Sequence, residues 1–165
     1  MQQVILSHLQ IEQKINRLAH QILENTFEEK EVFIAGIEGN GSILAELITE
    51  IIISNSTQEI SLFTIKMDKD SPLSCAIELS IEKERINNSC VVLIDDVLNS
   101  GKTMQYALGK LLEQPLRTIK TVALVDRKHR RYPIKADFVG LSLSTTLKEH
   151  VKISLEKGNY SAHLN

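Results

Sequence analysis

Two adjacent carboxylates, Asp95 and Asp96, follow the apolar run 91–94 in the second half of the chain. Such a run is typical of a buried strand in a parallel sheet, and ligands bind beyond the carboxyl ends of these strands. Two ionised carboxylates can accept hydrogen bonds from two neighbouring sugar hydroxyls. The loop 99–103 (Asn-Ser-Gly-Lys-Thr) comes next, and backbone N–H groups at a helix start favour a phosphate. Together these residues predict a site for a sugar phosphate.

Two other interpretations of this motif are less satisfactory. A nucleoside-triphosphate P-loop would need a glycine five positions before Gly101, and Asp96 stands there. Alternatively, the acidic pair could simply cap the loop that follows it. The apolar run and the Gly-Lys-Thr sequence attached to the pair favour a ligand site instead. Lys102 is interpreted as a phosphate-side or solvent cation and not as a catalytic base.

Strands and helices alternate along the chain, which predicts an α/β fold with a mostly parallel sheet. Buried-strand patterns occur at 32–37, 60–65, 91–94, 121–125 and 138–143, and residues 151–155 alternate as an edge strand does. Helical spacing predicts helices at about 11–23, from the N-cap Ser42 to about Asn55, and from 104 to Pro115. The pattern fades between 68 and 89, where we expect a long mobile loop.

The chain has 165 residues and a net charge of −2, so it suits one domain and no global attraction to nucleic acid or membrane is implied. No apolar run approaches membrane-spanning length, and the N-terminus lacks the features of a signal peptide. Cys75 and Cys90 do not make a disulfide framework, and the five histidines lack metal-ligand spacing. We therefore expect a single domain, 1–165, in the cytoplasm and without a membrane partner.

The segment 91–103 resembles the 5-phosphoribosyl-1-pyrophosphate (PRPP) signature of type I phosphoribosyltransferases. The resemblance extends to residues 18–20, 35–37, 123–130 and 133–140, which are similar to the bifunctional pyrimidine operon attenuator/uracil phosphoribosyltransferase group. It implies the type I phosphoribosyltransferase fold, in which helices flank a central, mostly parallel sheet. It also implies a small hood, built mainly from residues 127–165.

The same resemblance implies a role for each part of the site. Asp95 and Asp96 would be the catalytic pair, holding the ribose hydroxyls and sensing Mg²⁺ through PRPP without binding the metal directly. The other implied residues are Asn99, Ser100, Gly101, Lys102 and Thr103 around the 5-phosphate, Glu38, Gly39, Asn40 and Gly41 in the pyrophosphate loop, and Arg127, Phe138, Val139 and Gly140 at the base and hood. The implied reaction is displacement of pyrophosphate by a ring nitrogen of a nucleobase. Uracil is the leading base, and Mg²⁺ is the cofactor.

Two segments depart from the family pattern. The pyrophosphate loop usually carries Thr-Arg-Gly, whereas residues 39–41 are Gly-Asn-Gly, preceded by Glu38. The mobile loop lacks the family's Tyr-Arg-Asp-Asp run, and residues 67–70 (Met-Asp-Lys-Asp) keep one cation but no aromatic hydroxyl. Losing a hydrogen bond to a charged group costs about 1.5–3 kcal/mol. The alternative function is therefore a catalytically weak or inactive regulator that senses PRPP or a nucleotide. A purely structural domain is disfavoured because the acidic pair and phosphate loop are intact.

One dense basic cluster, 127–131 (Arg-Lys-His-Arg-Arg), has Lys135 nearby. In the resembling group this region contributes to RNA binding, through phosphate contacts that would be sensitive to salt. A solvated turn or a contact between subunits would also explain the cluster. We favour that interpretation because only Tyr132 is available for stacking and the chain is net acidic. Arg127 is the exception, because Asp126 before it ends a strand on the ligand side of the sheet. The expected partners are thus PRPP and a nucleobase or nucleotide, with RNA as a secondary candidate, and the resemblance implies a homodimer.

Overall fold

The computed structural model describes residues 2–165, which form two sheets and three α-helices. The larger sheet has six strands in the order β4-β3-β2-β5-β6-β7. Their bounds are β2 Glu31–Ile37, β3 Glu59–Lys66, β4 Glu78–Leu79, β5 Cys90–Leu98, β6 Thr118–Asp126 and β7 Phe138–Ser142. Neighbouring strands are parallel except for β3 and the two-residue β4. The predicted α/β fold with a mostly parallel sheet is confirmed.

The strand order reverses between β2 and β5. The chain passes from β2 to β3 on one side, whereas β5 is followed by β6 and β7 on the other. Because Ala35 pairs with Leu93 and Gly36 pairs with Ile94, the chain leaves both strands at the same edge of the sheet. Such a topological switch point forms a crevice for ligands in open α/β sheets. The fold thus brings the segments that follow β2 and end β5 to one place.

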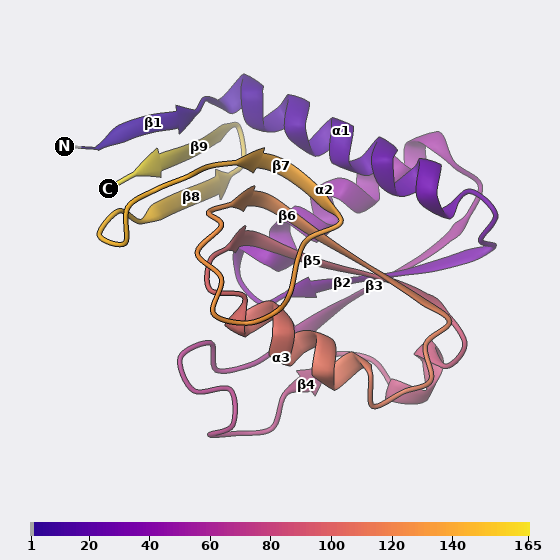
Figure 1. Cartoon of the computed structure of the whole chain (residues 1–165). Coiled ribbons are helices and arrows are strands. Elements are labelled where there is room, and N and C mark those ends of the chain that lie inside the picture. The colour runs from indigo at the N-terminus through magenta and orange to yellow at the C-terminus, as the bar shows by residue number, and fades with distance from the viewer. Residues whose placement is uncertain (1) are drawn as a thin grey trace.

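Helices cover both faces of the larger sheet (Figure 1). On one face lie α1 (His8–Thr26) and α2 (Asn40–Asn55), and on the other lies α3 (Lys102–Leu111). Each face has its own apolar core, and Ile34 packs in the core with α1 and α2, whereas Phe33 and Ala35 pack in the core with α3. The two-residue period of a strand produces this division. Strands buried on both faces require the near-continuous apolar sequences seen in β2 and β5.

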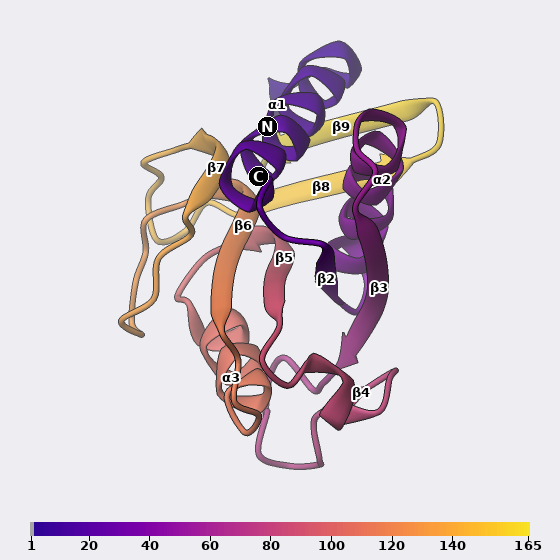
Figure 2. The ribbon, with the colours of Figure 1, turned by 90° about the vertical axis from the view of Figure 1, so that its right-hand side faces the viewer.

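A second, antiparallel sheet forms the hood. Its strands are β1 (Gln3–Leu6), β9 (Asn159–Leu164) and β8 (Val151–Glu156), in the order β1-β9-β8. Figure 2 shows this sheet on the same side of the molecule as α1 and α2. Ile153, Leu155 and Ala162 of the hood join the core that contains these helices. The hood therefore combines both ends of the described chain, and β8 is an edge strand as predicted.

The structure places Phe138, Val139 and Gly140 in the larger sheet and not in the three-stranded one, and their role at the base stays a prediction. These residues lie in β7, which pairs parallel with β6 at the edge of the larger sheet. A Cβ atom on Gly140 would lie 2.4 Å from the carbonyl oxygen of Leu124, so the backbones approach closely there. The guanidinium of Arg17 on α1 donates to the carbonyl oxygens of Val139 (3.2 Å) and Gly140 (2.7 Å) and covers this edge. The strand pattern is correct, but long-range pairing with β6 decides its place.

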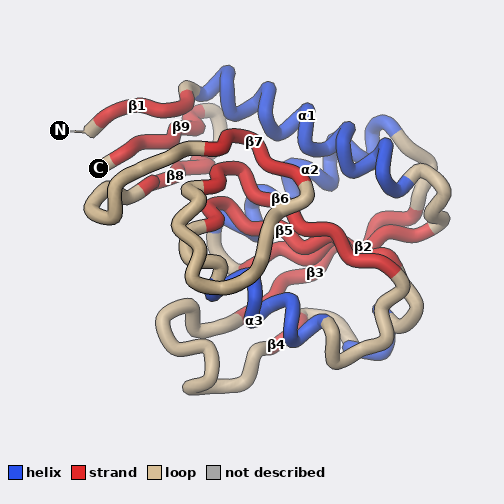
Figure 3. The backbone as a smooth tube through the Cα atoms, in the orientation of Figure 1, coloured by secondary structure: helices blue, strands red, loops and turns tan. Residues whose placement is uncertain are grey.

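The segment 68–89 contains more regular structure than its sequence pattern indicates. It includes β4 and a 3-10 helix (η1, Lys83–Ile86), whose Ile86 is fully buried. The stretch between β3 and β4 is a loop that lies beside α3 (Figure 3). We call residues 67–77 the β3–β4 loop.

The start of α2 also differs from its prediction. The helix begins at Asn40 and its N-cap is Gly39, whereas the Ser42 hydroxyl donates to the Gly39 carbonyl oxygen at 2.7 Å. The earlier start places Asn40 and Gly41 in the first turn of the helix. No helix within residues 2–165 combines the length and apolar character needed to cross a membrane.

Candidate active site

The loop 99–103 between β5 and α3, which we call the phosphate loop after its predicted ligand, turns at Gly101 into the start of a helix. Gly101 has φ +86°, and a Cβ atom there would lie 2.6 Å from Cγ2 of Ile134, so this position requires glycine. The helix begins at Lys102, earlier than the Met104 start indicated by apolar spacing. The N–H groups of a first turn have no partners within the helix and carry the positive end of its dipole. All five residues predicted to wrap the phosphate, 99–103, line a hollow of about 40 Å³ here.

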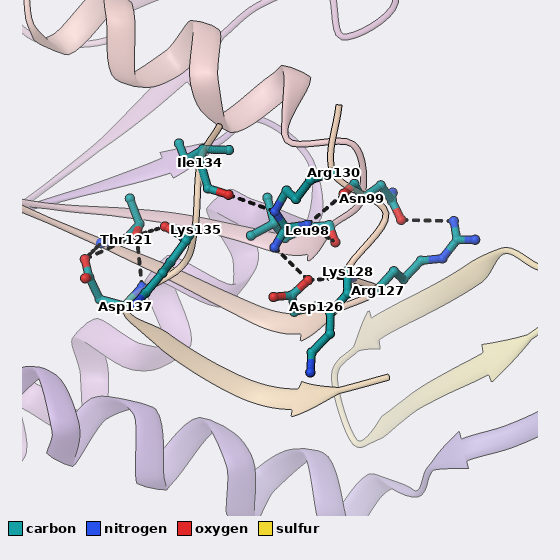
Figure 4. A network of polar contacts seen from close by, with 10 residues as sticks. All are labelled: Leu98, Asn99, Thr121, Asp126, Arg127, Lys128, Arg130, Ile134, Lys135 and Asp137. Atoms are coloured by element: carbon teal, nitrogen blue, oxygen red, sulfur yellow. Dashed lines mark hydrogen bonds and ion pairs between the residues drawn. The ribbon is translucent and has the colours of Figure 1, made fainter. Parts of the chain in front are cut away.

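Arg130 braces this phosphate loop from behind (Figure 4). Its guanidinium donates to the carbonyl oxygens of Asn99 and Ile134, both at 2.8 Å, and forms an ion pair with Asp126 at 2.7 Å. The Arg130 side chain is 24% exposed and that of Asp126 is 12% exposed. Its charge is therefore used inside the protein to hold the loop backbone in place.

Arg127 is a second inward-facing arginine of the basic cluster. It is 5% exposed, and its guanidinium donates to Asn99 Oδ1 at 3.0 Å, to Thr145 Oγ1 at 3.1 Å and to the carbonyl oxygen of Glu149. These contacts join the phosphate loop to the connection between β7 and β8. The resemblance placed Arg127 at the base, whereas the structure gives its guanidinium a buried bracing position. The sequence signal for this position is that Arg127 directly follows Asp126, at the end of a strand on the ligand side of the sheet.

The acidic pair lies within β5, shortly before its end. Asp95 is 4% exposed, and its Oδ1 accepts a hydrogen bond from the N–H of Asp96 at 2.9 Å. Asp96 is half-buried, and its Oδ1 accepts from the N–H of Val97 at 2.8 Å. Burial, together with the charge of Asp96, raises the pKa of Asp95 to about 7, although the Lys69 ammonium opposes this rise. A buried acid with a strongly shifted pKa in a crevice is a candidate functional group.

The predicted pyrophosphate loop lies directly beside the acidic pair. A Cβ atom on Gly41 would lie 3.0 Å from Asp95 Oδ1, so the two segments are in close contact. The Asn40 amide donates to Asp96 Oδ2 at 3.1 Å and to the carbonyl oxygen of Ile153 in β8 at 3.0 Å. Asn40 thus connects the acidic pair, the start of α2 and the hood. The hood strand that is connected to the acidic pair, through Asn40, is therefore β8.

The remaining predicted residues of this loop, Glu38 and Gly39, are exposed. Glu38 faces a hollow of about 450 Å³ that Lys66, Met67 and Asp68 also line. The pyrophosphate loop and the β3–β4 loop therefore share one opening.

Two lysines connect the site to the β3–β4 loop. Lys69 Nζ lies 3.9 Å from Asp95 Oδ1, and Lys102 Nζ donates to the carbonyl oxygen of Asp70 at 2.8 Å. The sequence shows one cation, Lys69, among residues 67–70 of this loop. It carries no signal for the contact between Lys69 and Asp95, because that contact joins segments far apart in the chain.

The donor set fits a metal ion only in part. Among residues 2–165, no group of three or more His, Cys, Asp or Glu side chains is arranged to hold a metal. Asp95 and Asp96 supply two carboxylates, and one of them is paired with Lys69. Mg²⁺ commonly binds one or two carboxylates together with substrate phosphates. The site therefore suits Mg²⁺ shared with a phosphorylated ligand and does not suit an all-protein metal centre.

The acidic pair lies between two glycine-containing loops at the switch point of the sheet, as expected for the type I phosphoribosyltransferase fold. The sequence matches the family described as "Phosphoribosyl transferase domain" over residues 1–156, and the chain belongs to this family. It is accordingly a phosphoribosyltransferase, and the resemblance stated from the sequence is confirmed.

Curated relatives match nearly the whole chain. The "Bifunctional protein PyrR" of Staphylococcus epidermidis is 37% identical over 164 residues, which cover 94% of this chain and 93% of the relative. The protein of the same name from Actinobacillus pleuropneumoniae is 32% identical over 163 residues, covering 93% and 89%.

Solved structures show the same fold. A hypoxanthine-guanine phosphoribosyltransferase from Bacillus anthracis has a TM-score of 0.74 at 18% identity, covering 99% of this chain and 97% of that one. A hypoxanthine phosphoribosyltransferase from Staphylococcus aureus has a TM-score of 0.72 at 19% identity, covering 87% and 79%.

Proposed function

We propose that this protein transfers the phosphoribosyl group of PRPP to a nucleobase, first of all uracil, and releases pyrophosphate with Mg²⁺ present. The observation that carries the proposal is the position of the acidic pair between the phosphate loop and loop 38–41. A ribose held by Asp95 and Asp96 would direct its 5-phosphate to one loop and its pyrophosphate to the other. The choice of uracil rests on the resemblance alone.

In the proposed reaction, the chain mainly positions the reactants. Asp95 and Asp96 would accept hydrogen bonds from the ribose hydroxyls, and the N–H groups of loop 99–103 would bind the 5-phosphate. The two carboxylates would also stabilise positive charge that develops on the ribose ring as pyrophosphate leaves. The β3–β4 loop would exclude water from the opening. Mg²⁺, when bound with PRPP, would neutralise the leaving pyrophosphate.

Pyrophosphate release from PRPP, measured with one nucleobase at a time, tests this proposal. We expect Mg²⁺-dependent release with uracil, which Asp95→Asn combined with Asp96→Asn should abolish. Glu24→Gln removes an exposed carboxylate of α1 and is the matched control. Pyrophosphate release only in the presence of a purine would show that the purine, and not uracil, is the substrate. PRPP binding without release for any base would reject the transfer reaction.

A second function is favoured by the composition of loop 38–41. Glu38 is its only charged residue, so the loop has no cation to meet a pyrophosphate. A protein that holds PRPP or a nucleotide without turnover could act as a regulator, and RNA is the partner that the resemblance suggests. The relatives are named bifunctional proteins, which is consistent with a second activity. Tight PRPP binding without turnover, together with salt-sensitive RNA binding, would favour this function over the first.

Two further expectations concern the state of the protein in the cell. We propose a homodimer, which sedimentation at micromolar concentration would test; a monomer throughout the range would reject it. We also propose a cytoplasmic location, which suits the unpaired thiols of Cys75 and Cys90. Fractionation of cells that produce the protein would test this location.

A further inference from the structure

Lys69 makes the one ion pair that the acidic pair forms within residues 2–165. Its Nζ lies 3.9 Å from Asp95 Oδ1, and the two side chains are 43% and 6% exposed, respectively. The ammonium group therefore enters from the solvent side and meets a carboxylate buried behind it. This intramolecular contact occupies the carboxylate that a ribose hydroxyl would use.

The turn that carries Lys69 is held in shape by hydrogen bonds. Asp68 Oδ1 accepts from the N–H groups of Asp70 and Ser71, both at 3.0 Å. On the other side of the turn, Lys102 of the phosphate loop donates to the Asp70 carbonyl oxygen at 2.8 Å. Lys69 thus projects from a structured turn that is tied to the phosphate loop.

Two lysines lie near loop 38–41 and could meet the pyrophosphate of PRPP: Lys66 lines the opening beside Glu38, and Lys69 reaches Asp95. Glu38, Asp95 and Asp96 place three carboxylates in this region. Phosphate oxygens are usually bound by charge-assisted hydrogen bonds from lysine or arginine. Arg127 and Arg130 of the basic cluster already donate hydrogen bonds to Asn99 of the phosphate loop. Lys69, in contrast, already reaches the acidic pair from the exposed side.

We propose that Lys69 binds the pyrophosphate group of PRPP, and that its pairing with Asp95 is a latch that the ligand opens. This inference rests on the proposed function and adds to it a named residue and a ligand-free state. When ribose hydroxyls bind Asp95, the ammonium group is released beside loop 38–41. The contact between Lys102 and Asp70 opens in the same step, because the 5-phosphate competes for that lysine. The turn then closes on the ligand.

Calorimetric binding of PRPP, inorganic pyrophosphate and ribose 5-phosphate, each with Mg²⁺, tests the assignment. With Lys69→Met, we expect PRPP and pyrophosphate affinity to fall about 10–100-fold, as for one lost charge-assisted hydrogen bond. Ribose 5-phosphate should bind equally or more tightly, because no latch competes for Asp95. Lys69→Arg keeps the charge and should retain most PRPP affinity. Lys83→Met, at an exposed lysine of η1, is the matched control and should change none of the three.

The outcomes separate this inference from the proposed function. Wild-type protein that binds neither PRPP nor ribose 5-phosphate would overturn the proposed function. Wild-type binding that Lys69→Met leaves unchanged would overturn the role of Lys69 alone. A loss confined to Lys66→Met would assign the pyrophosphate to that lysine, which lines the opening beside Glu38. An equal fall for all three probes, at an unchanged unfolding temperature, would also overturn the assignment.

Discussion

Replacing Asp95 by asparagine should stabilise the folded protein by an amount that depends on pH. Burial raises the pKa of Asp95 from its ordinary 3.8 to about 7, with a further contribution from the charge of Asp96. Between about pH 4 and pH 7, the folded state therefore holds a proton that the unfolded state has released. Because the unfolded state binds fewer protons in this window, the wild-type free energy of unfolding falls as pH rises. The fall ends above the pKa of the folded state.

The size of this effect follows from the two pKa values. A rise from 3.8 to about 7, at about 1.4 kcal/mol per pH unit, lowers the free energy of unfolding by about 4 kcal/mol at about pH 8. At about pH 5, only about 2 kcal/mol of this decrease has developed. Asp95→Asn has nearly the same shape without the charge, so it should recover these amounts. The pair with Lys69 is already part of this balance, because the ammonium group lowers the pKa that burial and Asp96 raise to about 7.

Urea unfolding of the wild type and Asp95→Asn, at about pH 5 and at about pH 8, measures the difference in the free energy of unfolding at each pH. The control Asp70→Asn removes an exposed carboxylate and should change the free energy of unfolding by less than about 0.5 kcal/mol at either pH. An equal gain at both pH values, or a loss at the higher one, would refute the burial argument. Asp95→Asn should also abolish ribose binding, so stability would rise while function is lost.

Three further substitutions test the frame of the site. Gly101→Ala should destabilise the protein by about 2 kcal/mol, because φ is +86° and the new Cβ would lie 2.6 Å from Ile134. The free energy of unfolding measured in denaturant and the affinity for ribose 5-phosphate should both fall. Asn40→Ala removes hydrogen bonds to the acidic pair and to the hood, and should lower the free energy of unfolding by about 1–2 kcal/mol and reduce kcat. Arg130→Met leaves its partner carboxylate unpaired and should cost about 2 kcal/mol, less than for a fully buried pair because the arginine is 24% exposed. Arg131→Met, at an exposed neighbour, should change the unfolding midpoint little.

The position of the candidate site was predictable because it depends on local sequence. The apolar start of β5, the acidic pair and the loop with Gly101 are contiguous, so strand, ligand groups and helix start can be recognised together. The position of β7 was not predictable in this way. Residues 138–142 have a strand pattern whether they pair with β6 or join the hood, and only tertiary packing selects between these. The contact of Lys69 with Asp95 was likewise hidden, because the β3–β4 loop has no periodic pattern that fixes its path.

The basic cluster shows why a charged sequence does not define a charged surface. Arg127 and Arg130 donate hydrogen bonds to the phosphate loop and its surroundings, whereas Lys128 and Arg131 are exposed. Replacing Arg130 would therefore disturb the phosphate loop and any RNA surface together, and the result could not distinguish them. Lys128→Ala with Arg131→Ala removes two exposed charges and leaves both inward arginines in place.

If the exposed part of the cluster binds RNA, this double variant has a definite signature. Each lost phosphate contact should reduce the slope of log affinity against log salt by about 0.7–0.9, so two contacts reduce it by about 1.5. PRPP binding, measured on the same preparation, should stay at the wild-type level because the loop 99–103 keeps its braces. An unchanged slope would reject this surface as an RNA contact. A parallel loss of PRPP affinity would instead show that the exposed residues also support the phosphate loop.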